Sequence, residues 1–277
     1  LSNKLSARYI AQGALWKMGD IFQLSIELYD NQDEKLLWSD RWQESWENLP
    51  SIKNNLSDGL LKALNTKPKE ENKEYTSNSE AYEYYLKAVF KWEKRELVND
   101  TVVVRELLNK SIEIDDDFLL AKNLLAKTFL VMGDYDDAMQ IYSSALEQAE
   151  KLDDKKNLVK SLNSIGEIYL VKEGNKDKAL KYFEKSLSIS KDIGDKSGMG
   201  DCYEKLGSIY SENSEYDKSL EYCEKSLSIF NELDNKNGVI SSIHNFGVTY
   251  YRKSEYDKSL EYFDKQYTYC KKIFQEQ

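Results

Sequence analysis

The chain has 277 residues, of which 40% are hydrophobic and 32% are charged, and its net charge is −10 at pH 7. The acidic balance argues against nucleic acid or an anionic membrane as the main partner. No run of about 18 apolar residues is present, so we predict no direct membrane insertion. We predict a cytoplasmic location, with the periplasm or the outer side of an inner-membrane protein as the alternative.

The first third of the chain differs from the rest, because it holds all five tryptophans. Two runs rich in β-forming residues, 8–16 and 22–29, are separated by a hairpin signal at 17–20. A third strand is predicted over 35–42, and residues 49–64 have helical spacing with Pro50 at the helix start. These elements predict a small α+β domain of order β-β-β-α over residues 1–65, followed by a charged linker over 66–78.

Three short motifs in this part of the chain carry a resemblance. They are Gly13-Ala14-Leu15 with Gly19, then Leu28-Tyr29-Asp30, and then Leu37-Trp38-Ser39-Asp40-Arg41-Trp42. Together they resemble the later half of the TolB-like amino-terminal domain of bacterial proteins. One helix on three strands is a small core for such a domain, and the chain begins with Leu1 rather than Met. We therefore expect the sequence to be a fragment.

The rest of the chain repeats a phrase at a fixed interval. Tyr182-Phe183-Glu184-Lys185-Ser186-Leu187 returns 40 residues later at 222–227 and again, in weaker form, at 262–267. A small residue followed three positions later by an aromatic one precedes each phrase, with spacings of 40, 41 and 40, at Ala126, Gly166, Gly207 and Gly247. A period of this size predicts an array of helical repeats. The extra residue falls at 173–175, in a predicted turn.

Each unit contains the signals of two packed helices. The small residue allows close helix approach, and the aromatic residue lies on the same helical face. Turns are predicted at 133–135, 214–216 and 254–256 within units, and polar breaks at 153–155, 194–196 and 234–236 between them. In the first unit the turn around 95–101 is predicted to be lengthened.

These units resemble tetratricopeptide repeats (TPRs), although they are longer than the usual unit of about 34 residues and lack its final proline. The resemblance implies a mainly α protein. We predict a TPR α-solenoid of about five helix-turn-helix units over residues 79–277. A TolB-like domain before such repeats is similar to proteins found downstream of bacterial class III adenylate or guanylate cyclases. That similarity implies a signalling assembly.

Nothing in the sequence predicts catalysis. His244 is the single histidine, so most histidine-dependent schemes are excluded, including His-Glu-x-x-His zinc sites and any site with a second histidine ligand. Three cysteines, Cys202, Cys223 and Cys270, are interpreted as buried free thiols, and the 49 acidic residues alternate with lysines on helix faces. We predict that the protein is not an enzyme and has no catalytic residues, metal site or cofactor.

Binding is expected on the concave surface that the first helices of stacked repeats line. Asp201, Glu204 and Glu212 cluster in one unit and favour a basic segment of a protein or peptide. The alternative for each such residue is an ordinary solvated side chain. The groove positions implied by the resemblance include Asn123, Lys127, Lys160, Asn163, Glu167, Asp201, Glu204, Glu212, His244, Tyr251 and Arg252.

We therefore predict a non-enzymatic scaffold for protein-protein interaction. Two alternatives stay open: a peptide-sensing regulator and a self-associating scaffold. In the last predicted helix, Tyr262, Phe263, Tyr267 and Tyr269 have no following unit in this sequence to cover them. We expect that this end either continues in a longer native chain or mediates self-association.

Overall fold

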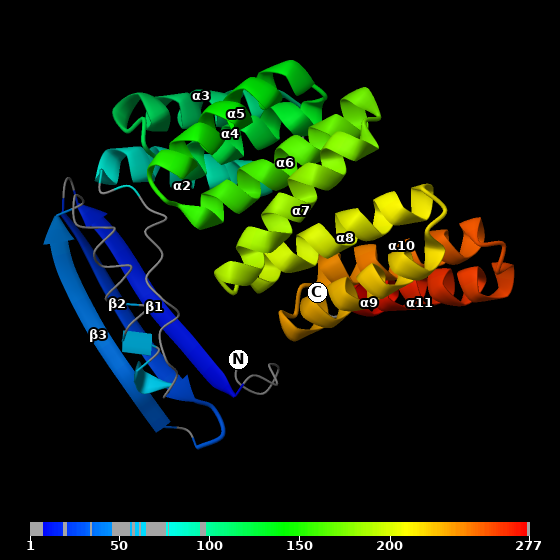
Figure 1. Ribbon diagram of the computed structural model, residues 1–277. Helices are drawn as coiled ribbons and strands as arrows, with labels where there is room; N and C mark the ends of the chain where they lie inside the picture. The colour runs from blue at the N-terminus through cyan, green and yellow to red at the C-terminus, as the bar shows by residue number, and fades with distance from the viewer. Residues whose placement is uncertain are drawn as a thin grey trace. The chain divides into compact units, whose positions relative to one another are not determined.

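The computed structural model describes residues 8–18, 21–33, 35–45, 56, 59–60, 62–64, 76, 78–94 and 98–275. In these residues the chain forms three strands followed by ten helices (Figure 1). Its internal contacts divide it into two compact units, Leu1–Ala121 and Lys122–Gln277. The fold is mainly α, with a repeat solenoid preceded by a small sheet, as predicted.

The sheet is antiparallel and its strands lie in chain order: β1 (Tyr9–Met18), β2 (Ile21–Asp30) and β3 (Lys35–Ser45). Met18 pairs with Ile21, so the predicted hairpin at 17–20 is confirmed as a tight connection. Phe22 and Leu28 are buried on one face of β2, which agrees with the alternating pattern of this strand. A bulge between Leu28 and Tyr29 shifts the register against β3.

The helix predicted over 49–64 is described only in part. Residues 56, 59–60 and 62–63 are helical, and the others lie outside the described residues. Gly59 lies directly on Trp38 of β3, because a Cβ atom placed on this glycine would be 2.5 Å from the indole ring. Most of the predicted linker at 66–78 also lies outside the described residues, so the domain boundaries at 65 and 78 stay predictions.

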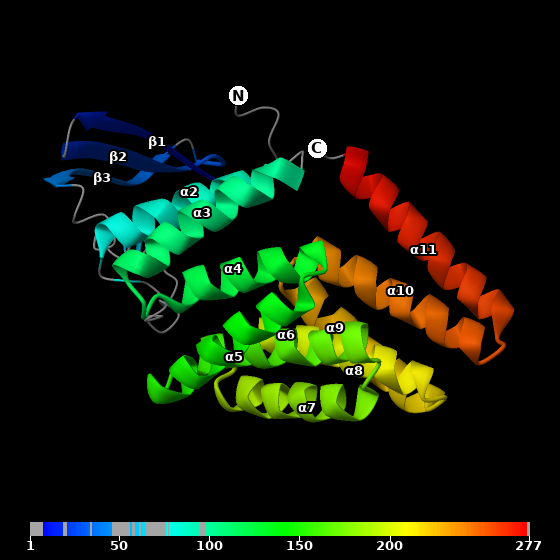
Figure 2. The ribbon, with the colours of Figure 1, turned by 90° about the horizontal axis from the view of Figure 1, so that it is seen from above.

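The ten helices form five consecutive pairs: α2 (Ser79–Glu93) with α3 (Val98–Ile114), α4 (Leu119–Met132) with α5 (Tyr135–Lys151), α6 (Lys155–Glu173) with α7 (Lys176–Asp192), α8 (Lys196–Glu212) with α9 (Tyr216–Glu232), and α10 (Lys236–Arg252) with α11 (Tyr256–Gln275). Within the compact unit Lys122–Gln277, the second helix of each pair packs on the first helix of the next pair: α5 on α6, α7 on α8 and α9 on α10 (Figure 2). The predicted five helix-turn-helix units are thus confirmed.

The first pair has a longer turn than the later pairs. The predicted position of this turn, around 95–101, overlaps the start of α3 at Val98, but four residues still separate α2 from α3, where two or three join the two helices of the later pairs. Residues 95–97 of this turn lie outside the described residues. Thr101, Val104 and Leu108 lie on one face of α3 and are each buried.

Helix ends are defined by local chemistry at the predicted breaks. The side chains of Asp154, Asn175 and Asn235 each accept a hydrogen bond from the backbone N–H three residues later, which caps α6, α7 and α10. Seven turns place a residue in the left-handed region just after a helix, at Gly133, Asp153, Gly174, Gly194, Ser214, Asp234 and Ser254. α6 has 19 residues where α8 and α10 have 17, and the turn after α6 has two residues where the turns after α8 and α10 have three, so this repeat is longer by the one extra residue.

The small residue of each unit lies at the contact between its two helices. A Cβ atom on Gly166 would be 3.0 Å from the Phe183 ring, and one on Gly247 would be 2.7 Å from the Phe263 ring. The glycines therefore let an aromatic side chain of the second helix reach the backbone of the first.

Candidate partner-binding surface on the first helices

In the compact unit Lys122–Gln277, the first helices of successive pairs form a continuous layer. α6 contacts α8, and α8 contacts α10. α4 joins α6 through Asn123, whose Nδ2 donates to Asn157 Oδ1 at 3.0 Å. Helices that touch both their own partner and the next first helix form the inner layer of a repeat array, the side that presents a groove.

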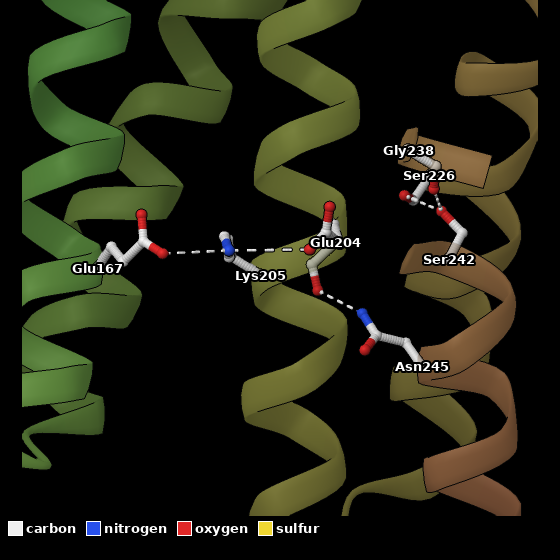
Figure 3. A network of polar contacts seen from close by, with 7 residues as sticks. All are labelled: Glu167, Glu204, Lys205, Ser226, Gly238, Ser242 and Asn245. Carbon is white, nitrogen blue, oxygen red and sulfur yellow. Dashed lines mark hydrogen bonds and ion pairs between the residues drawn. The ribbon is translucent and has the colours of Figure 1, made fainter. Parts of the chain in front are cut away.

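A charged network crosses this layer at its centre (Figure 3). Lys205 on α8 lies between two carboxylates, with its Nζ 3.5 Å from Glu167 on α6 and 3.7 Å from Glu204 on α8. Asn245 on α10 donates from Nδ2 to the backbone oxygen of Glu204 at 3.3 Å. Side chains from three consecutive first helices thus meet at one level.

The surroundings of this network shift the pKa values of its charged side chains. Burial raises the pKa of Glu204, and the Glu167 carboxylate raises it further, although the Lys205 ammonium opposes both. Burial on its own lowers the pKa of Lys205, but Glu167 and Glu204 outweigh that effect and the pKa ends above its ordinary value. Lys205 is therefore held in its charged form by the two carboxylates.

Asp201 adds a further carboxyl one turn before Glu204. Its side chain still reaches solvent, but the surrounding helices displace much of the nearby water. This partial burial, together with the Glu204 carboxylate, raises the pKa of Asp201 to about 6, while Lys205 and Lys127 act in the opposite direction. Three carboxyl groups thus lie near Lys205 and Lys127, which leaves the centre of α8 with an excess of negative charge.

A second ion-pair cluster lies at the carboxyl ends of the same helices. Glu212 at the end of α8 pairs with Lys176 of α7 at 3.1 Å and with Arg252 of α10 at 3.7 Å. The predicted residues Glu212 and Arg252 are therefore brought together, and their charges are partly neutralised.

α10 contributes an aromatic edge to the layer. His244 is exposed, with Nδ1 3.3 Å from Gln266 Oε1 and its ring centroid 5.7 Å from that of Phe263. Tyr251 is 60% exposed and meets Tyr256 edge-on at 5.6 Å. Both predicted residues present surface to solvent.

Two predicted asparagines are occupied within the protein. Asn123 is buried, and besides donating to Asn157 it accepts a hydrogen bond from Ser161 Oγ at 3.1 Å. Asn163 is half-buried, and its Oδ1 accepts from the Cys202 thiol at 3.2 Å. Asn123 is therefore a structural residue between α4 and α6 and leaves the candidate surface. Lys127 and Lys160 are exposed, as a surface residue requires.

Three residues of these contacts were not among those predicted: Lys205 and Asn245 in the charged network, and Lys176 in the second ion-pair cluster. Lys205 occupies the position after Glu204, where the other units have Leu124, Ser164 and Asn245. The sequence signal for Lys205 was that only one repeat has a basic residue at this position. The residue was missed because only the groove-facing positions of each repeat were considered.

In the part of the chain that the structure describes, no three side chains of His, Cys, Asp or Glu are grouped to hold a metal ion. None of the described helices combines the length and the apolar character of a membrane span.

Comparisons with known proteins agree with this architecture. The tetratricopeptide repeat family matches residues 117–192 and 201–272. No curated protein sequence matches the chain. One similar solved structure is the apo form of RapI, which is 17% identical, with a TM-score of 0.59 over 71% of this chain and 72% of RapI. Another is BtubC from P. vanneervenii, which is also 17% identical, with a TM-score of 0.51 over 70% of this chain and 89% of BtubC.

A third similar structure is a Signal Transduction ATPase with Numerous Domains from Pyrococcus horikoshii that carries a tetratricopeptide repeat sensor. It is 22% identical, with a TM-score of 0.57 over 68% of this chain. The chain spans only 29% of the length of that protein. At these identities the likeness concerns the fold.

Proposed function

Because the chain belongs to the tetratricopeptide repeat family, whose fold is a non-catalytic scaffold for protein-protein interaction, we propose that its first helices bind a basic segment of a protein partner. The segment lies along α6, α8 and α10 and places a lysine or arginine beside Asp201. Preformed helices lower the entropic cost of ordering the site when the segment binds.

The observation that carries this proposal is the unbalanced charge around Asp201. Glu167 and Glu204 lie beside Lys205. Burial and the Glu204 carboxylate raise the pKa of Asp201 to about 6, even though Lys205 and Lys127 both lower it. A cationic side chain from a partner would favour the ionised form of this carboxyl. Binding would then relieve a charge excess that the free protein carries. Glu212 and Arg252 already pair with each other and are placed at the margin of the proposed site.

A peptide array tests the charge preference directly. Twelve-residue peptides of matched length and apolar content, either lysine-rich, arginine-rich, neutral or acidic, are probed with the full chain. We expect retention of the basic peptides only. The triple variant Glu167→Gln, Asp201→Asn, Glu204→Gln should lose that retention, because it removes the carboxylates while keeping side-chain size.

A matched control removes three exposed carboxylates from second helices instead, by Glu184→Gln, Glu221→Gln and Glu224→Gln. The two triple variants have the same net charge, so general attraction to an acidic protein would weaken equally in both. If the control loses basic peptides as fully as the first variant, the site is not on α6 and α8. Equal retention of neutral and basic peptides would refute the charge preference itself.

We further propose that this scaffold is part of a bacterial signalling assembly linked to a nucleotide cyclase, in the cytoplasm. The TolB-like motifs of residues 1–65 support the proposal, and the strands that carry them form an antiparallel sheet in chain order. The organisation that goes with it is a TolB-like part over 1–65, a charged linker over 66–78 and the repeats over 79–277. Reading the coding sequence upstream of Leu1 tests the link, which fails if no cyclase is encoded in the same reading frame or beside it.

A further inference from the structure

The last helix presents an apolar stripe to solvent. Tyr256, Leu260, Phe263, Tyr267 and Cys270 follow the spacing i, i+4, i+7, i+11, i+14, which places them on one face of α11. Tyr256 is 56%, Leu260 63% and Tyr267 70% exposed. Large apolar side chains in a row at such exposure mark a contact surface.

The same positions in earlier units are covered by the next helix pair. In α7, Phe183 and Leu187 are buried in one cluster with Cys202 and Tyr203 of α8. In α9, Phe230 is buried with Val239 and Ile243 of α10. The stripe is therefore the face on which the repeat ordinarily receives another helix. α11 is the last described helix and packs beside α10 (Figure 2). Among the described helices none covers Leu260 and Tyr267, which stay exposed.

Charges beside the stripe indicate what kind of helix fits there. Asp257, Asp264 and Lys271 are spaced seven residues apart, so they form one line along α11 that borders the stripe. An antiparallel copy of α11 centred on Asp264 would place Asp257 opposite Lys271 at both ends and Leu260 within one residue of the level of Tyr267. In this register the only like charges that face each other are the two copies of Asp264. A parallel copy would instead oppose like charges at all three positions. In an antiparallel pair, the positive end of each helix dipole also lies beside the negative end of the other, which is favourable.

We propose that a second copy of this chain packs its α11 antiparallel on this stripe, which gives a two-fold symmetric dimer. A two-fold interface uses the same patch on both protomers, so one self-complementary stripe is sufficient. Leu260 and Tyr267 form its apolar centre, and the two Asp257–Lys271 pairs select the antiparallel direction.

Sedimentation velocity over a concentration series measures the association. We expect a monomer-dimer equilibrium for the full chain and a monomer for Tyr267→Glu, which puts a charge into the apolar centre. Asp257→Lys and Lys271→Asp should each weaken dimerisation about tenfold, because two attractive pairs become repulsive. The double variant Asp257→Lys with Lys271→Asp restores opposite charges and should recover most of the affinity.

Matched controls are available on other helices. Asp177 occupies the place of Asp257 in α7, so Asp177→Lys should leave dimerisation unchanged. Val171→Glu alters a similarly exposed apolar residue of α6 and should also have no effect. All substituted residues are exposed, and circular dichroism checks that each variant is folded. A strictly monomeric native chain, or a double variant no better than its single reversals, would overturn the proposal.

Discussion

Phe263 of α11 lies so close to Gly247 of α10 that a Cβ atom on the glycine would be 2.7 Å from its ring. The equivalent Gly207 meets a smaller neighbour, Cys223, whose sulfur would be 3.3 Å from the added carbon. The same repeat position is therefore tight in one unit and less crowded in another.

Alanine substitution should separate the two glycines. Gly247→Ala forces the Phe263 ring to move and should lower the free energy of unfolding by about 1–3 kcal/mol. Gly207→Ala gains helix propensity of up to about 1 kcal/mol and should be neutral or stabilising. Urea unfolding followed by circular dichroism compares them. Equal losses would mean that the size of the facing side chain does not decide the cost.

Two serines adopt a backbone conformation that suits glycine. Ser214 has φ of 64° and Ser254 has φ of 65°, whereas Gly133 and Gly174 occupy the equivalent turns at 85° and 61°. A Cβ atom is unfavourable in the left-handed region, so Ser214→Gly and Ser254→Gly should each stabilise the fold by about 0.5–1 kcal/mol. Thermal unfolding measures the gain. The opposite kind of change, Gly174→Ala, should lower the melting temperature, and a rise there would contradict the explanation.

The raised pKa of Asp201 predicts how stability depends on pH. This carboxyl has a pKa near 3.8 when unperturbed and about 6 in the fold, so the folded chain binds the proton more tightly than the unfolded chain. Its contribution is therefore fully present at low pH and is lost as the pH rises from about 4 through 6.

Asp201→Asn removes this dependence. The variant should match the native chain near pH 4 and exceed its free energy of unfolding at pH 8. Because solvent screens the exposed side of Asp201, we expect the gain in free energy of unfolding at pH 8 to be only about 1 kcal/mol, less than the full pKa shift would give. Urea unfolding at both pH values measures it, with Asp177→Asn as the exposed control. A gain of the same size at both pH values would show that charge is not the cause.

Thiol reactivity distinguishes the three cysteines. Burial raises the pKa of Cys202 to about 11 and that of Cys223 to about 12, while Cys270 is half-buried. Since the thiolate is the reactive form, an aromatic disulfide reagent should label one thiol in the native monomer, at a protein concentration below that of the proposed dimerisation, and three after unfolding. Cys270→Ser should abolish the native reaction. Rapid labelling of that variant would contradict the described packing of α8 and α9.

The repeat architecture was predictable from the sequence because its signals are local. Gly166, Gly207 and Gly247 recur at nearly constant spacing, and each meets a residue of its own unit's second helix. Capping side chains such as those of Asp154 and Asn235 accept a hydrogen bond from a backbone N–H only three residues further along the chain. Their positions alone therefore indicate where helices begin.

The properties of the candidate surface were decided by the tertiary structure. Asn123 has a groove position in the repeat pattern, yet Asn157 and Ser161 from the next unit enclose it. Lys205 joins Glu167 across two helices, and the pKa of Asp201 depends on how closely several helices surround it. Spacing along one helix determines which residues share a face. Burial, charge balance and titration depend on distances between helices, which only the folded chain establishes.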